Sequence, residues 1–306
     1  MSQRSGITPA YWLALVIGNT RLHWGYFCRE KFLGSWHTPH LTEAIATQLQ
    51  QSNFRLEGWQ AVTAWAEGYT PFELDLLPTE DIASSSIWVA SVVLDQSDLW
   101  RGPARLAQFV ERSQIPLSGL YPTLGIDRAI NLLGAGDLEG WPVLVIDAGT
   151  AITFTAGVDS AIYGGAILPG LKSQQEALAQ KTAVLARFMP AMNALSLDSL
   201  SLDSLSLDSL DAEADAEAAL PERWAGNTEG AIASGLTYGI TATVIDYLQS
   251  WWQQFPTGKA VITGGDGPAI HHYLQQRTPE LASRVLLNSD LMFYGMRAYK
   301  KAFTNL

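Results

Sequence analysis

A turn motif that occurs twice constrains the fold of this chain more than any other feature. The first copy runs from Val16 to Trp24 and the second from Ile146 to Phe154. Each copy reads as an apolar strand, a short turn with glycine and threonine, and a second strand of alternating pattern. Because the two copies lie far apart in the sequence, they are not neighbouring hairpins of one meander. The pattern predicts two related units.

Both turns have the composition of a phosphate-binding turn. Gly18 and Gly149 allow the backbone to approach a ligand closely. Successive N–H groups in such turns form a concave anion site, and the side chains of Asn19, Thr20 and Thr150 add neutral donors. The natural ligand of two such turns is the triphosphate of a nucleotide, gripped from two sides.

A third glycine turn follows a later apolar strand. Val261 to Thr263 reads as a strand that ends at Gly264-Gly265-Asp266-Gly267. The three turns together fit the nucleotide cleft of actin- and hexokinase-like proteins, with the last turn near adenosine. We therefore expect an α/β fold of two related ribonuclease H-like domains with a nucleotide cleft between them. The expected limits are a disordered tail at 1–9 and domains at 10–125 and 126–306.

The remaining pattern predicts helices and strands between these turns. Thr42 caps an expected helix at 41–52, and Asp127 opens another at 128–135. The other expected elements are a strand at 87–93, helices at 103–113, 171–188, 227–255, 268–276 and 289–302, a short strand at 161–166, an apolar loop at 164–170 and a helix-ending turn at 134–140. Small residues recur every four positions at Ala231, Gly235 and Gly239, which suits either packing on a sheet or close approach of a nucleotide.

The composition argues against nucleic acid or an anionic membrane as the main partner. The 306 residues carry a net charge of −11, whereas both partners are bound through basic patches. Residues 195–220 hold seven of the acidic side chains and no Lys or Arg, and without them the net charge is −11 + 7 = −4. This repetitive segment is expected to be an insertion in a surface loop.

Cysteine content and the N-terminus indicate a cytoplasmic protein. Cys28 is the single cysteine, so neither an intramolecular disulfide nor a multi-cysteine zinc site can form. The first nine residues lack the apolar core of a signal peptide. No P-loop, His-Glu-x-x-His or Gly-x-Ser-x-Gly motif is present.

Over nearly its whole length the chain resembles the type III pantothenate kinases. The matching stretches are Gly18-Asn19-Thr20, Gly125-Ile126-Asp127-Arg128, Asp147-Ala148-Gly149-Thr150-Ala151, Gly164 to Gly170, Lys181-Thr182 and Gly264-Gly265-Asp266. The resemblance implies ATP-dependent phosphorylation of pantothenate, the first step of coenzyme A biosynthesis. It also implies a homodimer, Mg-ATP and a monovalent cation, K⁺ or NH₄⁺.

The resemblance also implies roles for individual residues. Asp127 would be the general base, and Asp147 would bind the cation. The residues implied to bind ATP are Gly18, Asn19, Thr20, Arg21, Gly149, Thr150, Gly264 and Gly265. Those implied to bind pantothenate are Tyr121, Gly125, Ile126, Arg128 and Thr182, the last across the dimer interface. Such roles suit phosphoryl transfer, which needs an oriented nucleophile and neutralised phosphate charge.

Each role has a plainer alternative. Asp127 could be a helix N-cap, Arg128 a solvated first-turn residue, Asp147 a turn carboxylate bonded to local N–H groups, and Thr182 a threonine on a helix surface. Val16 stands where the family usually has aspartate and cannot ligate a metal. A non-catalytic nucleotide-binding regulatory protein, or a kinase of another small hydroxylated acid, therefore remain the alternative functions.

Overall fold

The computed structural model describes residues 11–66, 86–101, 107–182, 185 and 220–304. Its contacts divide the chain into two compact units, Met1–Leu138 with Met292–Leu306, and Glu139–Leu291. The expected domain limits at 10–125 and 126–306 stay a prediction, since this division rests on contacts alone. The expected tail at 1–9 and all but the last residue of the expected insertion at 195–220 lie outside the described residues.

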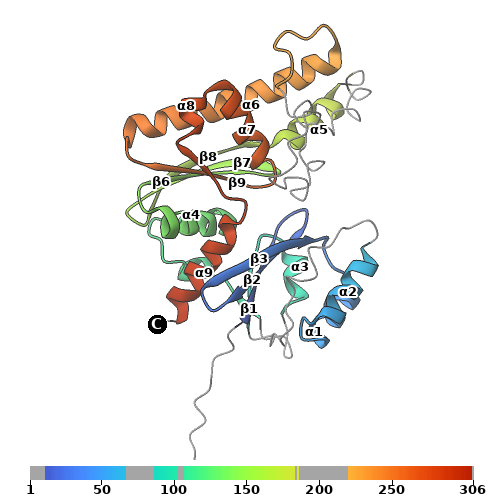
Figure 1. The fold of residues 1–306 in the computed structure, drawn as a ribbon. Coiled ribbons are helices and arrows are strands. Elements are labelled where there is room, and N and C mark those ends of the chain that lie inside the picture. The colour runs from blue at the N-terminus through green and yellow to red at the C-terminus, as the bar shows by residue number, and fades with distance from the viewer. Residues whose placement is uncertain (1–10, 67–85, 102–106, 183–184, 186–219, 305–306) are drawn as a thin grey trace, which may run out of the picture. The chain divides into compact units, whose positions relative to one another are not determined.

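The first unit is built on a five-stranded sheet in the order β3-β2-β1-β4-β5 (Figure 1). Its strands are β1 Tyr11–Ile17, β2 Leu22–Cys28, β3 Lys31–Thr38, β4 Ile87–Ser91 and β5 Gln108–Phe109. Its helices are α1 Glu43–Gln51, α2 Leu56–Trp65, α3 Leu94–Asp98, α4 Ile126–Glu139 and α9 Leu291–Thr304, with a 3-10 turn at Arg112–Gln114. The first three strands pair antiparallel, and β4 and β5 add in parallel.

The second unit repeats this topology, with the sheet order β10-β9-β6-β7-β8. Its strands are β6 Val143–Ala148, β7 Ala151–Val158, β8 Ala161–Pro169, β9 Lys259–Thr263 and β10 Val285–Leu287. Its helices are α5 Leu171–Lys181, α6 Thr228–Gln254, α7 Gly267–Arg277 and α8 Pro279–Ala282. Three antiparallel strands and two parallel additions again place the first strand at the centre. This duplicated ribonuclease H-like sheet confirms the predicted fold class.

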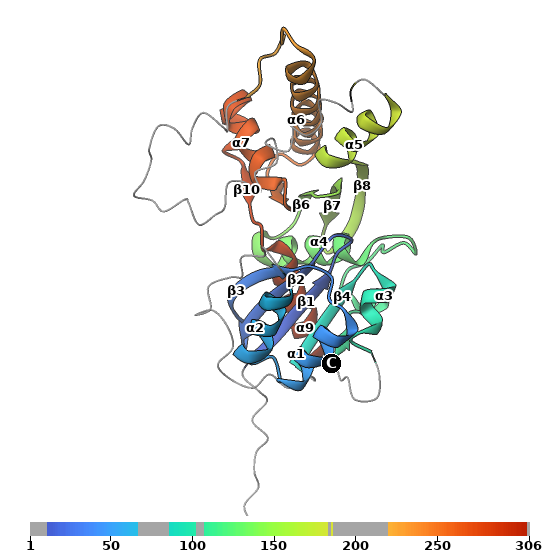
Figure 2. The same cartoon turned by 90° about the vertical axis from the view of Figure 1, so that its right-hand side faces the viewer.

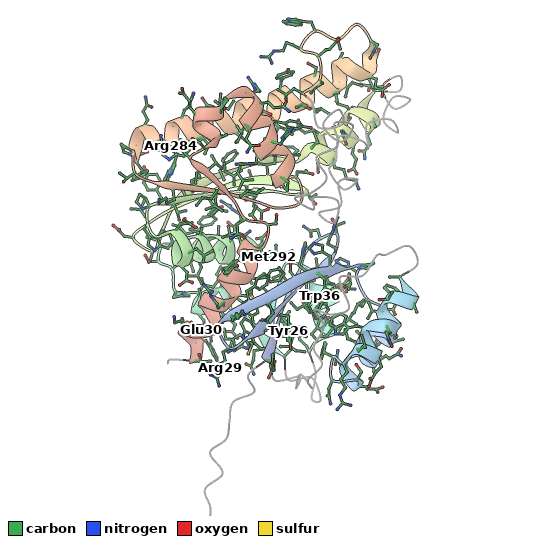
Figure 3. All side chains as sticks on the ribbon, viewed as in Figure 1. Tyr26, Arg29, Glu30, Trp36, Arg284 and Met292 are labelled. Atoms are coloured by element: carbon green, nitrogen blue, oxygen red, sulfur yellow. The ribbon has the colours of Figure 1, made fainter. Side chains whose placement is uncertain are left out.

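Helices cover both faces of the first sheet. Trp24 and Trp59 belong to the core between the sheet and helices α1 and α2, and Figure 2 shows these helices in front of the sheet and α9 behind it. Phe293 of α9 lies so close to Gly25 that a Cβ there would stand 2.4 Å from the ring. Lys301 of the same helix pairs with Glu30 at the β2–β3 turn, which Figure 3 labels. The last helix of the chain thus completes the first unit.

In the second unit a large apolar cluster joins the sheet to α6 and α7. Ile146 and Ile262 of the central strands are fully buried against residues such as Val244 and Leu274. Figures 1 and 2 both show α6 and α7 on one side of this sheet. None of the helices in the described residues is long and apolar enough to span a membrane.

Most predicted elements are confirmed, including both hairpins and the long helix α6. Thr42 caps α1, since its hydroxyl accepts a hydrogen bond from the Ile45 N–H, and Asn227 caps α6 in the same way through Gly230. The helix predicted at 103–113 is wrong for its described part, where β5 pairs with β4. Residues 103–106 lie outside the described residues. The same holds for the end of the helix predicted at 171–188, with the exception of residue 185. The pattern did not predict β3, α2, α8 or β10.

Two predicted interruptions are regular structure instead. The apolar loop predicted at 164–170 is strand β8 up to Pro169, because β8 is an edge strand and an edge tolerates Gly and Pro. The turn predicted at 134–140 is helical up to Glu139. Burial of the surrounding helix outweighs the roughly 1 kcal/mol that each glycine costs there. Gly140 follows with a φ of 79°, as a glycine after a helix end commonly does.

Candidate functional site

The first glycine turn, residues 18–21, connects β1 to β2. The Gly18 N–H donates to the Arg21 carbonyl at 3.1 Å and closes the turn. The Gly18 carbonyl accepts a hydrogen bond of 2.8 Å from Nε2 of His40, which lies just before α1. Asn19, Thr20 and Arg21 are exposed, so their side chains are available to a ligand.

Two further histidines lie behind this turn. His23 is the register partner of Val16 on β1 and of His37 on β3. The rings of His23 and His37 meet edge to face at 4.8 Å. Burial, together with the nearby His37 and Arg21, lowers the pKa of His23 to about 3. His23 is therefore neutral at physiological pH, beside an apolar Val16.

The N-terminus of α4 gathers the residues predicted to bind pantothenate. The Asp127 carboxylate accepts a hydrogen bond from the Arg128 N–H at 2.8 Å. A Cβ on Gly125 would stand 2.3 Å from the same carboxylate oxygen. The Arg128 guanidinium donates to the Tyr121 hydroxyl at 3.0 Å. Tyr121, Gly125, Ile126, Asp127 and Arg128 thus lie together in the first unit.

This geometry removes two of the plainer alternatives. Asp127 is the second residue of α4 and not its cap, because the helix begins at Ile126 and the Ala129 N–H bonds to the Gly125 carbonyl. Arg128 is buried, with 8% of its surface exposed, and is not a solvated residue. A carboxylate and a guanidinium on the first turn of a helix can bind two kinds of group. The guanidinium can bind an acid, and the carboxylate can accept a hydrogen bond from a hydroxyl.

The second glycine turn, residues 149–150, is held by backbone atoms. The Gly149 N–H donates to the Ala151 carbonyl at 3.1 Å, and the Gly170 N–H donates to the Thr150 carbonyl at 2.9 Å. A Cβ on Gly170 would stand 2.0 Å from the Gly149 oxygen. Ser173 also donates to the Thr150 carbonyl. The end of β8 and the start of α5 therefore clamp this turn.

Asp147 lies on β6 between two threonines of the neighbouring strands. Its register partners are Thr153 on β7 and Thr263 on β9, so the three side chains share one face of the sheet. The Thr263 hydroxyl is fully buried and has no hydrogen-bond partner among the described residues. Gly264 has a φ of 90°, and a Cβ there would stand 2.6 Å from the Asp147 carboxylate oxygen.

These residues fit a cation that is also held by phosphate. The described residues contain no group of three or more His, Cys, Asp or Glu side chains that could hold a metal. Mg²⁺ in kinases is bound by one or two carboxylates together with substrate phosphates and water. One carboxylate, Asp147, and one buried hydroxyl without a partner, Thr263, match that pattern.

The third glycine turn leads into α7 beside a small pocket. The Asp266 N–H donates to the Ala148 carbonyl at 2.9 Å, which ties this turn to the second one. The pocket has a volume of only about 10 Å³ and is lined mainly by apolar residues of α5, α6 and α7, together with Asp266. Thr237 also lines it, but its hydroxyl is buried and has no hydrogen-bond partner among the described residues.

Two further predictions in the second unit concern Thr182 and the small residues of α6. Thr182 lies at the end of α5 and donates to the Leu178 carbonyl, and no described hydrogen bond brings it to Asp147 or Gly149. The small residues Ala231, Gly235 and Gly239 are exposed, so packing against the sheet is not their role.

The site residues therefore form two groups, each within its own unit. Gly18 to Arg21 and the residues at the start of α4 belong to the first unit. Asp147, Gly149, Thr150, Gly264 and Gly265 lie together in the second unit, at adjoining strand ends.

Sequence reasoning missed the three histidines near the first turn, His23, His37 and His40. Their clustering within 18 residues, in a chain with five histidines, was the available signal.

A duplicated 3-2-1-4-5 sheet with a glycine turn after each first strand defines the actin- and hexokinase-like class of fold. Two solved structures share the fold at a TM-score of 0.50. One, from Campylobacter jejuni, is provisionally assigned to the Baf family of transcriptional activators; it is 19% identical, and the match covers 96% of this chain and 100% of that one. The other, from Sinorhizobium meliloti, is provisionally named a 2-dehydro-3-deoxygalactonokinase; it is 13% identical, with the same coverage.

Within this class the chain belongs to the type III pantothenate kinase family, whose model matches residues 12–250. A type III pantothenate kinase of Nostoc sp. is 39% identical over 94% of this chain and 93% of its own length. That of Synechocystis sp. is 35% identical over 94% of this chain and 89% of its own length. The predicted resemblance is confirmed.

Proposed function

We propose that this chain transfers the γ-phosphoryl group of ATP to the primary hydroxyl of pantothenate, giving 4′-phosphopantothenate and ADP. This is the first step of coenzyme A biosynthesis, and it makes the chain a transferase with an alcohol acceptor. Membership of the type III pantothenate kinase family supports the reaction. The observation that carries the site is the Asp127 carboxylate on the first turn of α4, next to the buried Arg128, from whose backbone N–H it accepts a hydrogen bond.

In this proposal Asp127 accepts the proton of the hydroxyl and orients its lone pair toward the γ-phosphorus. Arg128 binds the pantothenate carboxylate by paired hydrogen bonds, and Tyr121, held by Arg128, completes that end of the site. Gly125 leaves room for the Asp127 carboxylate, where a side chain would collide with it. Ile126 supplies apolar contact at the same helix end.

The two glycine turns bind the triphosphate in this proposal. The residues assigned to it are Gly18, Asn19, Thr20, Arg21, Gly149 and Thr150. Gly264 and Gly265 contact the nucleotide near its adenosine. Asp147 holds a cation, Mg²⁺ with ATP or a monovalent K⁺ or NH₄⁺, which neutralises phosphate charge.

A homodimer in the cytoplasm is the expected form, with no nucleic acid or membrane partner. The family resemblance supports the dimer, and the single cysteine and the net charge of −11 support the location and the absent partners. Thr182 would then reach the substrate across the dimer interface. Sedimentation equilibrium should give twice the chain mass of 33.3 kDa, and a monomer would remove this role of Thr182.

The test of the reaction is turnover by the purified chain with pantothenate and Mg-ATP, with and without K⁺. Asp127→Asn keeps the shape of the side chain but removes the base, and we expect turnover to fall by about 10²–10⁴-fold. Asp137→Asn is the matched control, because Asp137 lies on the same helix and pairs with Arg297 on the surface. Nucleotide binding by the wild type without pantothenate-dependent ADP release would instead favour the regulatory alternative.

A further inference from the structure

The inference concerns His40, a side chain outside every matching stretch of the family resemblance. It lies 22 positions after Gly18, in the segment between β3 and α1, and Nε2 is 2.8 Å from the Gly18 carbonyl oxygen. A carbonyl oxygen only accepts hydrogen bonds, so Nε2 carries the proton and donates. This contact joins a side chain from elsewhere in the unit to the first glycine of the turn.

Fixing the Gly18 carbonyl also fixes the next N–H group. The Gly18 carbonyl and the Asn19 N–H belong to one planar trans peptide and point in opposite directions. The Asn19 N–H is thereby turned away from His40. No described residue accepts a hydrogen bond from it, and Asn19 itself is exposed. The Asn19 N–H is therefore a hydrogen-bond donor that is available to an anion.

The turn is constrained on its other sides as well. The Gly18 N–H is bonded to the Arg21 carbonyl, and Nε2 of His23 lies 3.5 Å from the place where a Cβ on Gly18 would stand. Among the described residues, His40 supplies the one hydrogen bond to the carbonyl of the peptide between Gly18 and Asn19, and it thereby sets the plane of that peptide. In glycine this plane would otherwise rotate freely.

We propose that His40 is a positioning residue for ATP: through the Gly18 carbonyl it orients the Asn19 N–H toward the triphosphate. The proposal rests on the proposed function in one respect, namely that the first glycine turn binds nucleotide phosphate. His40 does not contact the substrate in this role. Its effect falls on the affinity for ATP and not on the chemical step.

The experiment measures ATP binding directly by calorimetry, without pantothenate, and steady-state kinetics in parallel. We expect His40→Ala to raise the Kd for ATP about tenfold, the equivalent of one lost hydrogen bond of ~1.4 kcal/mol. The KM for ATP should rise in parallel, while kcat at saturating ATP and the KM for pantothenate stay within about twofold of wild type. His40→Gln, which keeps an N–H donor near the position of Nε2, should recover most of the affinity.

Thr42→Ala is the matched control for local destabilisation. It removes the cap of α1 two residues away and should lower the free energy of unfolding by about 1 kcal/mol without changing the Kd for ATP. An unchanged Kd in His40→Ala, or an equal rise in Thr42→Ala, overturns the proposal.

The proposal and the kinase function can fail separately. A wild type that binds ATP but does not phosphorylate pantothenate overturns the function, and His40→Ala still decides the proposal by its Kd. A wild type that turns over with an unchanged Kd in His40→Ala leaves the function standing and removes the role of His40. A wild type that binds no ATP overturns both.

Discussion

The two glycine turns occupy equivalent places in equivalent sheets, yet they are built from different parts. The residue two positions before the glycine is Val16 in the first unit and Asp147 in the second. Val16 lies between His23 and Ala90 of the neighbouring strands, whereas Asp147 lies between Thr153 and Thr263. One turn is thus backed by a neutral imidazole and apolar groups, the other by a carboxylate and hydroxyls.

The turns also differ in what holds them. A side chain, His40, fixes the Gly18 carbonyl, while the backbone of Gly170 packs against the carbonyls of Gly149 and Thr150. The comparison teaches that one fold motif can divide two tasks between its copies. In the proposed function, the second copy supplies the groups for a cation, and the first supplies only donors for phosphate.

The largest expected effect tests the backbone clamp of the second turn. A Cβ on Gly170 would stand 2.0 Å from the Gly149 oxygen and 2.8 Å from the Thr150 oxygen. Both are backbone atoms that cannot swing away, so Gly170→Ala should destabilise the protein by about 3 kcal/mol or more. Urea denaturation measures the change.

Gly149→Ala is the control for that substitution. Its Cβ would meet only the Ala151 oxygen at 3.9 Å, an ordinary contact, so the stability should change by less than about 1 kcal/mol. ATP binding should nevertheless weaken, because the methyl group occupies the approach of the phosphate. Equal stability losses in the two variants would contradict the clamp.

The duplication was readable from the sequence because it depends on local pattern. A strand, a glycine turn and a second strand repeat in the same order around Gly18 and Gly149, and their composition alone predicted both hairpins. The gathering of Tyr121 and Arg128 followed from the family resemblance. The contacts that distinguish the turns were not readable, since His40 and Gly170 come from segments 22 and 21 positions further along the chain.

The wrong predictions have a similar cause. Nothing local shows that β8 is an edge strand, where Gly164 to Pro169 continue the sheet. The interior glycines of α4 read as a turn because their tertiary packing is invisible in sequence. The neutral state of His23 depends on the strands that bury it, and therefore on the fold as a whole.

A smaller effect tests the assignment of the cation to the second turn. Asp147→Asn removes the charge but keeps the size of the side chain, and the cation concentration for half-maximal activity should rise about tenfold or more. Val16→Ala should leave that concentration unchanged, because valine contributes no ligand. Titration of Mg²⁺ and of K⁺ in the turnover assay measures both, and a matching shift in Val16→Ala would erase the distinction between the turns.

The smallest effect concerns the neutral histidine of the first turn. The folded-state pKa of His23 is about 3, below its ordinary value of 6.5, so the unfolded chain binds the proton more readily. The free energy of unfolding should therefore fall as the pH drops below about 6.5, by at most ~1.4 kcal/mol per pH unit from this group. His23→Leu should reduce that slope, as urea denaturation between pH 6.5 and 5 would show. An identical slope in the variant would mean that His23 is not buried in its neutral form.

Val16→Asp tests the same pH dependence of stability by changing β1, the strand that pairs with the one carrying His23. It gives the first turn the carboxylate of the second and places it directly opposite His23. A neighbouring negative charge favours the imidazolium, so the pKa of His23 should rise toward its ordinary value and the slope above pH 5 should shrink. If the slope stays as steep as in the wild type, the new carboxylate does not face His23, and the two turns cannot be compared residue by residue.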